Sequence, residues 1–140
     1  MPKRKLLKRS PPVSIPIPRW AAIIYFLFCI VLVPWTINLS LTLPTHHLSP
    51  HWDISWTGLD VGIIITLLIT AYLAYKKSKW VTMPAIATSV LLIADAWFDI
   101  MSSHAGTALD QAIILAIFVE LPVSIMSFLI AYHVLDKNID

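Results

Sequence analysis

The chain has 140 residues, of which 58% are hydrophobic and 13% are charged, whereas an ordinary soluble domain carries about a quarter charged residues. This composition predicts an integral membrane protein and excludes a separate soluble domain, because each span of the hydrocarbon core needs roughly 20 apolar residues. The basic residues are not interleaved with aromatic ones, which argues against nucleic-acid binding. A single cysteine, Cys29, excludes an intrachain disulfide and a cysteine-based zinc site.

Residues 1–19 form a basic, proline-rich tail for which the sequence predicts no regular fold. The apolar run at 20–43 follows and is long enough for a first transmembrane helix, which Pro34 is expected to bend. A cleaved signal peptide is the competing interpretation. The transmembrane helix is favoured because the run exceeds the usual 7 to 15 apolar residues of a signal peptide and lacks a small-x-small cleavage site.

The rest of the chain predicts three further spans. A loop at residues 44–56 is rich in histidine, and apolar runs then follow at 59–75, 80–101 and 109–135. Pro122 is expected to kink the last of these helices. Residues 136–140 form a short polar tail. The expected fold class is therefore all-α, a four-helix transmembrane bundle.

The formal net charge of +2 hides an uneven distribution of the ten Lys and Arg residues. Six precede the first span, three lie between the second and third, and one follows the fourth. The two loops on the other side of the membrane, at residues 44–56 and 102–106, contain no Lys or Arg. Because positively charged residues stay on the cytoplasmic side, both termini are expected in the cytoplasm, with the histidine-rich loop outside.

Four acidic residues fall within the predicted spans, where an Asp costs about 2.5 to 3.5 kcal/mol on insertion scales. They are Asp60, Asp95, Asp99 and Glu120. Helical rise places all four between the outer leaflet and the midplane. Ser124 follows Glu120 by four residues, so it shares a polar stripe on the fourth helix.

No Lys or Arg within the spans neutralises these carboxylates. Several carboxylates in a low dielectric cannot all stay ionised, which leaves three outcomes. Some carry protons, a metal or organic cation binds among them, or outer-loop histidines act as positive partners. The competing interpretation is that they are hydrogen-bonding groups between helices.

A second candidate site lies in the outer loops. Its ligands would be His47, His51, Asp53 and His104, which would bind zinc or copper if the two loops meet. Pro50 disfavours the helical geometry that would place His47 and His51 on one face. Solvated loop histidines are therefore the competing interpretation.

Two motifs carry a resemblance to known proteins: HWDISWTGLD at residues 51–60 and DAWFD at 95–99. With the turn around Pro122, they resemble a family of uncharacterised small four-helix membrane proteins of bacteria. The resemblance implies a multi-pass protein of the bacterial cytoplasmic membrane and points to the same acidic residues. It implies no substrate.

The leading hypothesis is an outward-facing acidic pocket that binds or translocates a proton, metal ion or organic cation. Translocation would require a homo-oligomer, because the chain lacks the inverted repeats of larger transporters. The first alternative is an intramembrane enzyme that acts on a lipid or quinone by carboxylate acid–base chemistry. The second is a structural or partner-binding subunit. Phosphate-binding loops, zincin helices and nucleophile elbows are missing from the sequence, so their chemistry is not expected.

Overall fold

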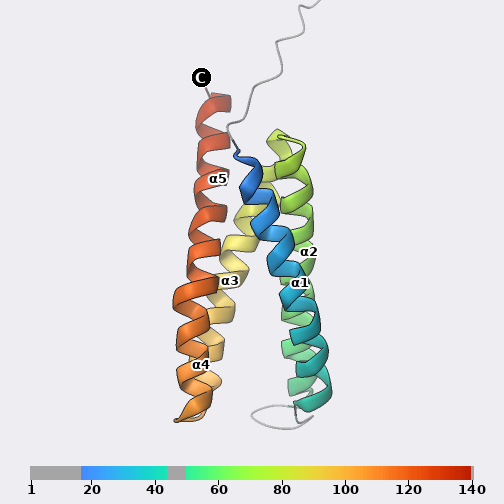
Figure 1. Ribbon diagram of the computed structural model, residues 1–140, viewed down its shortest axis with the longest axis vertical. Helices are drawn as coiled ribbons and strands as arrows, with labels where there is room; N and C mark the ends of the chain where they lie inside the picture. The colour runs from blue at the N-terminus through green and yellow to red at the C-terminus, as the bar shows by residue number, and fades with distance from the viewer. Residues whose placement is uncertain (1–16, 44–49, 140) are drawn as a thin grey trace, which may run out of the picture.

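The computed structural model describes residues 17–43 and 50–139, and it is largely helical there (Figure 1). Helices α1 (Arg19–Thr42) and α2 (Trp52–Tyr75) are followed by a short 3-10 turn, η1 (Lys79–Val81), and α3 (Thr82–Ser102). The last helix consists of α4 (Thr107–Leu115), a π-helical segment η2 (Ala116–Glu120) and α5 (Leu121–Ile139). The basic tail up to residue 16 lies outside the described residues, and so do His46 and His47 in the loop after α1.

Four stretches are long and apolar enough to cross a membrane. They are Arg19–Thr42, Trp52–Tyr75, Lys79–Ser102 and Thr107–Lys137. The expected all-α, four-span fold class is therefore confirmed, and the chain is a multi-pass membrane protein. Large apolar side chains cover the outside of the bundle, among them Leu41 (79% exposed) and Phe118 (74% exposed). Exposure of this kind around the whole bundle is typical of helices that face lipid.

The second helix begins at Trp52, about two turns before the start at residue 59 that hydropathy favours. Its first two turns mix polar and aromatic residues, so a prediction based on hydropathy does not include them in the span. Asp53 in the first turn complements the helix dipole, and His51 precedes the helix in a left-handed conformation with φ of 60°. Residues 52–56 are thus helix and not loop.

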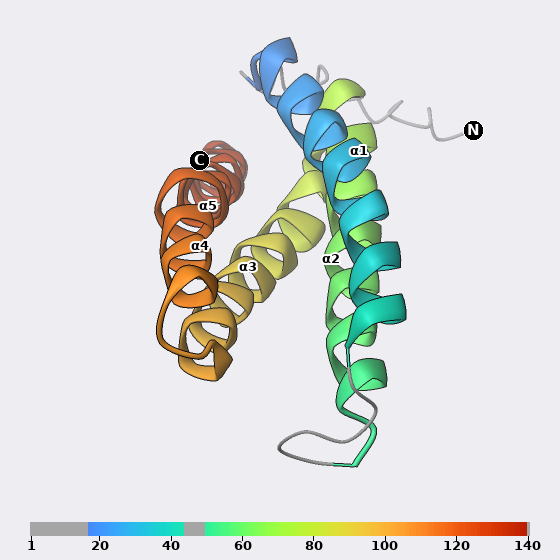
Figure 2. The same cartoon turned by 60° about the horizontal axis from the view of Figure 1, so that its bottom comes forward.

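Helices α1 and α2 pack along each other, α2 packs on α3, and α3 packs on α5 (Figure 2). Three buried hydroxyl pairs link them. The Tyr25 hydroxyl lies 2.8 Å from Ser127 Oγ, between α1 and α5. The other pairs are Thr70 with Thr88 at 3.2 Å and Ser89 with Ser124 at 3.0 Å. Such hydrogen bonds hold helices together in lipid, where no water competes for them.

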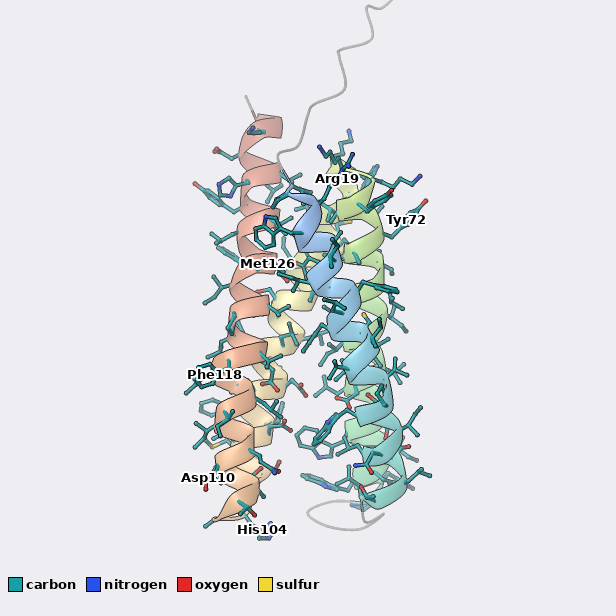
Figure 3. The ribbon with its side chains drawn as sticks, in the orientation of Figure 1. Arg19, Tyr72, His104, Asp110, Phe118 and Met126 are labelled. Atoms are coloured by element: carbon teal, nitrogen blue, oxygen red, sulfur yellow. The ribbon has the colours of Figure 1, made fainter. Side chains whose placement is uncertain are left out.

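The two ends of the bundle differ in charge. The start of α1, the end of α2 and the end of α5 lie together, so the described cations gather at one end, which we call the basic end (Figure 1). They are Arg19, Lys76, Lys77, Lys79 and Lys137. His104 and Asp110 lie at the opposite end, called the mouth end (Figure 3).

Replacing the fully buried Leu67 with alanine should lower the free energy of unfolding by about 2 to 4 kcal/mol, because the interior cannot fill the space left behind. Its neighbour Leu68 is 44% exposed and faces away from the core, so Leu68→Ala should cost less than about 1 kcal/mol. Reversible unfolding of both variants in mixed micelles measures the difference. If both variants lost the same free energy of unfolding, Leu67 would not be more buried than Leu68, which would contradict this orientation of α2.

Candidate functional site

A cavity of about 810 Å³ lies between the α1–α2 pair and the α3–α4 pair. It extends from the mouth end, where His104 and Gln111 line it, to Leu92 and Val123 near the middle of the bundle. Its two sides differ in chemistry. One side is an apolar wall from α1, made of Ile24, Leu27, Phe28, Val31, Leu32 and Trp35. The other side carries acidic groups from α3 and η2.

Three carboxyl groups meet on that second side and form what we call the carboxylate cluster: Asp95, Asp99 and Glu120. One oxygen of each lies within 4.8 Å of the others. Asp95 and Glu120 are buried, with 7% and 6% of their surface exposed, and Asp99 is half-buried. Asp95 and Asp99 are one helical turn apart on α3, which places both on the cavity side.

The π-helical segment η2 brings Glu120 to this position. Buried residues recur every fourth position along the last helix, at Ala112, Ala116, Glu120 and Ser124. In a plain α-helix of 3.6 residues per turn, each four-residue step drifts about 40° around the axis. The wider turns of η2, where the Leu121 N–H bonds to the Ala116 carbonyl, offset that drift.

Pro122 is the second residue of α5, two residues after the end of η2, and the sequence predicts a kink there. Proline supplies no N–H to the turn before it, which loosens the helical pattern at that point. The structure accommodates this with the wider turn of η2. Pro122, two residues after Glu120, was therefore the sequence signal for an altered helix at that residue.

Glu120 also carries an unpaired acceptor. Its Oε2 atom is buried and accepts no hydrogen bond from any described residue. Leaving such an atom unsatisfied costs about 1 to 3 kcal/mol, and more when the group is charged. An acceptor kept free at that cost, inside a cavity, is placed to receive a proton or a ligand.

Asp60 lines the same cavity from α2 but stands apart from the carboxylate cluster. The hydroxyl of Thr36 on α1 donates to its Oδ2 at 3.0 Å, and the same hydroxyl lies 2.9 Å from the Leu32 carbonyl oxygen. Asp60 is close enough to repel the cluster electrostatically. Thr36 was not predicted as a site residue, although a hydroxyl inside the apolar run at 20–43 was the available signal.

Positive charge is scarce around these groups. Of the residues described, no Lys or Arg lines the cavity. At the short separations seen in the carboxylate cluster, the repulsion of ionised groups is strong in a low dielectric. Binding of a proton or a cation at the cluster therefore lowers its electrostatic free energy.

Aromatic side chains surround the mouth of the cavity. Trp52 and Trp56 of α2 line it, with their rings edge to face at 5.6 Å. Trp56 is buried and also meets the Phe98 ring edge to face at 6.4 Å. Both tryptophans fall within the loop predicted at residues 44–56, so the sequence does not predict a place for them in a cavity. Their position in the cavity depends on the early start of α2, at Trp52.

The outer-loop metal site is not assembled in the part of the chain that the structure describes. His104 lines the cavity mouth, whereas His51 and Asp53 do not. His51 is exposed at the start of α2, where its carbonyl accepts from Ser55. His47 lies outside the described residues. Within residues 17–43 and 50–139, the group with metal-ligating geometry is the carboxylate cluster.

Ser124 has a packing role in this structure. Its hydroxyl lies 3.0 Å from Ser89 Oγ and 3.0 Å from the Ser89 carbonyl oxygen, which joins α5 to α3. It is buried, and it is not among the described residues that line the cavity. The polar stripe of the fourth helix is thus divided. Glu120 faces the cavity, and Ser124 faces a neighbouring helix.

Replacing Glu120 with leucine should raise the free energy of unfolding by about 1 to 3 kcal/mol when no ligand is present, because it removes a buried acceptor without a partner. The matched change Asp110→Leu alters an exposed residue in the first turn of α4 and should shift stability by less than about 1 kcal/mol. Unfolding in mixed micelles compares the two. Destabilisation by Glu120→Leu would mean that Glu120 holds the fold together.

No family model, curated protein or solved structure matches this chain. The resemblance of the motifs at 51–60 and 95–99 to small bacterial membrane proteins therefore stays a prediction. The interpretation of the site rests on its geometry, namely an apolar wall opposite three close carboxyl groups.

Proposed function

We propose that the protein binds a cation inside the membrane, with the carboxylate cluster of Asp95, Asp99 and Glu120 holding the positive charge. The observation that carries the proposal is the approach of three carboxylate oxygens to within 4.8 Å of one another in a cavity. The unpaired Oε2 of Glu120 supports it, because a bound cation would supply the missing partner.

A purely structural role for the acidic residues fits less well. Polar groups that join helices make hydrogen bonds across the interface. The hydroxyl pairs Tyr25–Ser127 and Ser89–Ser124 do this with short contacts of 2.8 Å and 3.0 Å. Glu120 Oε2 makes no such bond to the described residues, so it contributes nothing comparable to the packing.

Binding is favoured over translocation in the conformation described. The cavity reaches the mouth end, and towards the basic end the helices are joined by the buried contacts of Tyr25 with Ser127 and of Thr70 with Thr88. Translocation would need these contacts to open. In our proposal that step belongs to a second conformation or to a homo-oligomer.

An intramembrane enzyme is the second candidate, and the size of the cavity favours it. A volume of about 810 Å³ lies in the range of small-molecule sites and would hold much of a lipid or quinone. A carboxyl group of the cluster would then act as general acid or base. Turnover of a lipid or quinone that is lost in Glu120→Gln would favour this candidate over simple binding.

We also propose that the protein lies in the bacterial cytoplasmic membrane with the basic end in the cytoplasm. In a Cys29→Ala background, Ala105→Cys at the mouth end should react with a membrane-impermeant maleimide in intact cells whose outer membrane is permeabilised. Ser78→Cys, between α2 and η1, should react only after lysis. The reverse pattern would contradict this orientation.

The cation-binding proposal is tested with two probes, Mn²⁺ and dodecylamine, on the purified protein in nanodiscs. Trp52 and Trp56 line the cavity, so their fluorescence reports binding of either probe. Asp95→Asn and Glu120→Gln should each weaken binding of at least one probe by about tenfold or more, because a hydrogen bond to a charged group contributes about 1.5 to 3 kcal/mol.

Asp110→Asn is the control, since Asp110 is exposed outside the cavity lining, and it should leave binding unchanged. If neither probe depends on Asp95 or Glu120, the cluster does not bind cations and the proposal is wrong.

A further inference from the structure

We infer that the bound cation is the head group of a long-chain ammonium amphiphile, which enters the cavity sideways from the bilayer between α1 and α4. This inference rests on the proposed function, because the carboxylate cluster has to hold the positive group. The inference adds to the proposed function the chemical class of the ligand and the route by which it enters the cavity.

The cavity is much larger than the cluster needs. A metal ion or a small ammonium group takes roughly the space of one water molecule, about 30 Å³. The cavity measures about 810 Å³, which matches ligands of drug or lipid size. Most of the space therefore remains for an apolar body attached to the charge.

The wall opposite the cluster has the chemistry that such a body requires. The side chains that α1 contributes to the cavity are apolar along about three helical turns, from Ile24 to Trp35. A hydrated metal ion gains nothing from this wall. An alkyl chain that enters from the bilayer exchanges lipid tails for an equally apolar wall, so it can fill this space without a desolvation penalty.

The head group has to carry positive charge and donate hydrogen bonds. A neutral lipid with a hydroxyl group could donate to Glu120 Oε2, but it would leave the cluster without a counter-charge. A primary ammonium group offers three N–H donors, as a lysine side chain does, and the cluster offers three carboxylates within reach. The aromatic rings of Trp52 and Trp56 also line the cavity, and the faces of such rings attract cations.

The cavity also has a side that faces lipid. Helix α1 packs against α2 while α4 packs against α3, and no extensive contact joins α1 to α4 in the described part of the chain. Both views show α1 standing apart from α4 (Figures 1 and 2). Three lining residues of α1 at this opening are strongly exposed: Leu27 (55%), Val31 (65%) and Trp35 (45%). In our proposal, part of this exposed surface faces the cavity and part faces the hydrocarbon around the helix.

The test compares dodecylamine, ethylamine, dodecanol and Mn²⁺ on the protein in nanodiscs, read by tryptophan fluorescence with empty nanodiscs as the blank. Two variants of α1 separate the apolar body from the charge. Val31→Trp places a bulky ring at the lateral opening. Val33→Trp, the matched control, changes an exposed residue of the same helix outside the cavity lining.

We expect dodecylamine to bind at least tenfold more tightly than ethylamine and dodecanol. Val31→Trp should weaken dodecylamine binding at least fivefold, and Val33→Trp should leave it unchanged. Glu120→Gln should weaken it about tenfold. Any Mn²⁺ binding should be indifferent to Val31→Trp, because the ion does not use the apolar wall.

Two results overturn the inference, and they are distinguishable from each other. If Mn²⁺ or ethylamine binds through Asp95 and Glu120 while dodecylamine binds no better, the cation site stands and the amphiphile is wrong. If dodecanol binds as tightly as dodecylamine and no probe responds to Glu120→Gln, both the amphiphile and the proposed function are wrong.

Discussion

Repulsion among three carboxyl groups inside an apolar bundle is the constraint on which the rest of this structure depends. Asp95, Asp99 and Glu120 approach within 4.8 Å, and no Lys or Arg among the described residues lines the cavity around them. In a low dielectric, such a cluster lowers its free energy by taking up protons or a cation. In our proposal, the site is an incomplete charge arrangement that a ligand completes.

The remaining features of the fold hold this arrangement in place. The π-helical segment keeps Glu120 on the cavity side, and the Thr36 hydroxyl fixes Asp60 on the facing pair of helices. Away from the mouth, hydroxyl pairs such as Tyr25 with Ser127 take over the packing. The two pairs of helices are thus joined in the half nearer the basic end. In the other half they diverge around the cavity and its lateral opening, although the Trp56 ring on α2 still meets Phe98 on α3.

Much of this fold could be predicted from the sequence, because hydropathy reports the solvent around each helix. Apolar runs predict four spans, and the structure has them. The same signal fails at Trp52, where two polar turns of helix lie beyond the apolar window. Pro122 predicts a departure from regular helix, but whether it takes the form of a bend or a π turn depends on the packing of neighbouring helices.

The candidate site was only partly predictable. Asp60, Asp95, Asp99 and Glu120 stand out because acidic groups are costly in a span, and all four line the cavity. Which three of them meet depends on helix rotation and tilt, which composition does not encode. Ser124 shares the helical face of Glu120 by spacing, yet Ser89 binds its hydroxyl. The apolar wall of α1 could not be predicted either, because the sequence does not distinguish apolar residues that face a cavity from those that face lipid.

The most direct measurement is a structure of the protein determined with dodecylamine bound in nanodiscs. The account predicts density for the ammonium group within about 2.7 to 3.0 Å of Glu120 Oε2 and of an Asp95 oxygen, with the alkyl chain along the α1 wall. A cavity filled by lipid with no density at the cluster, or a basic side chain of this protein in contact with Glu120, would contradict it.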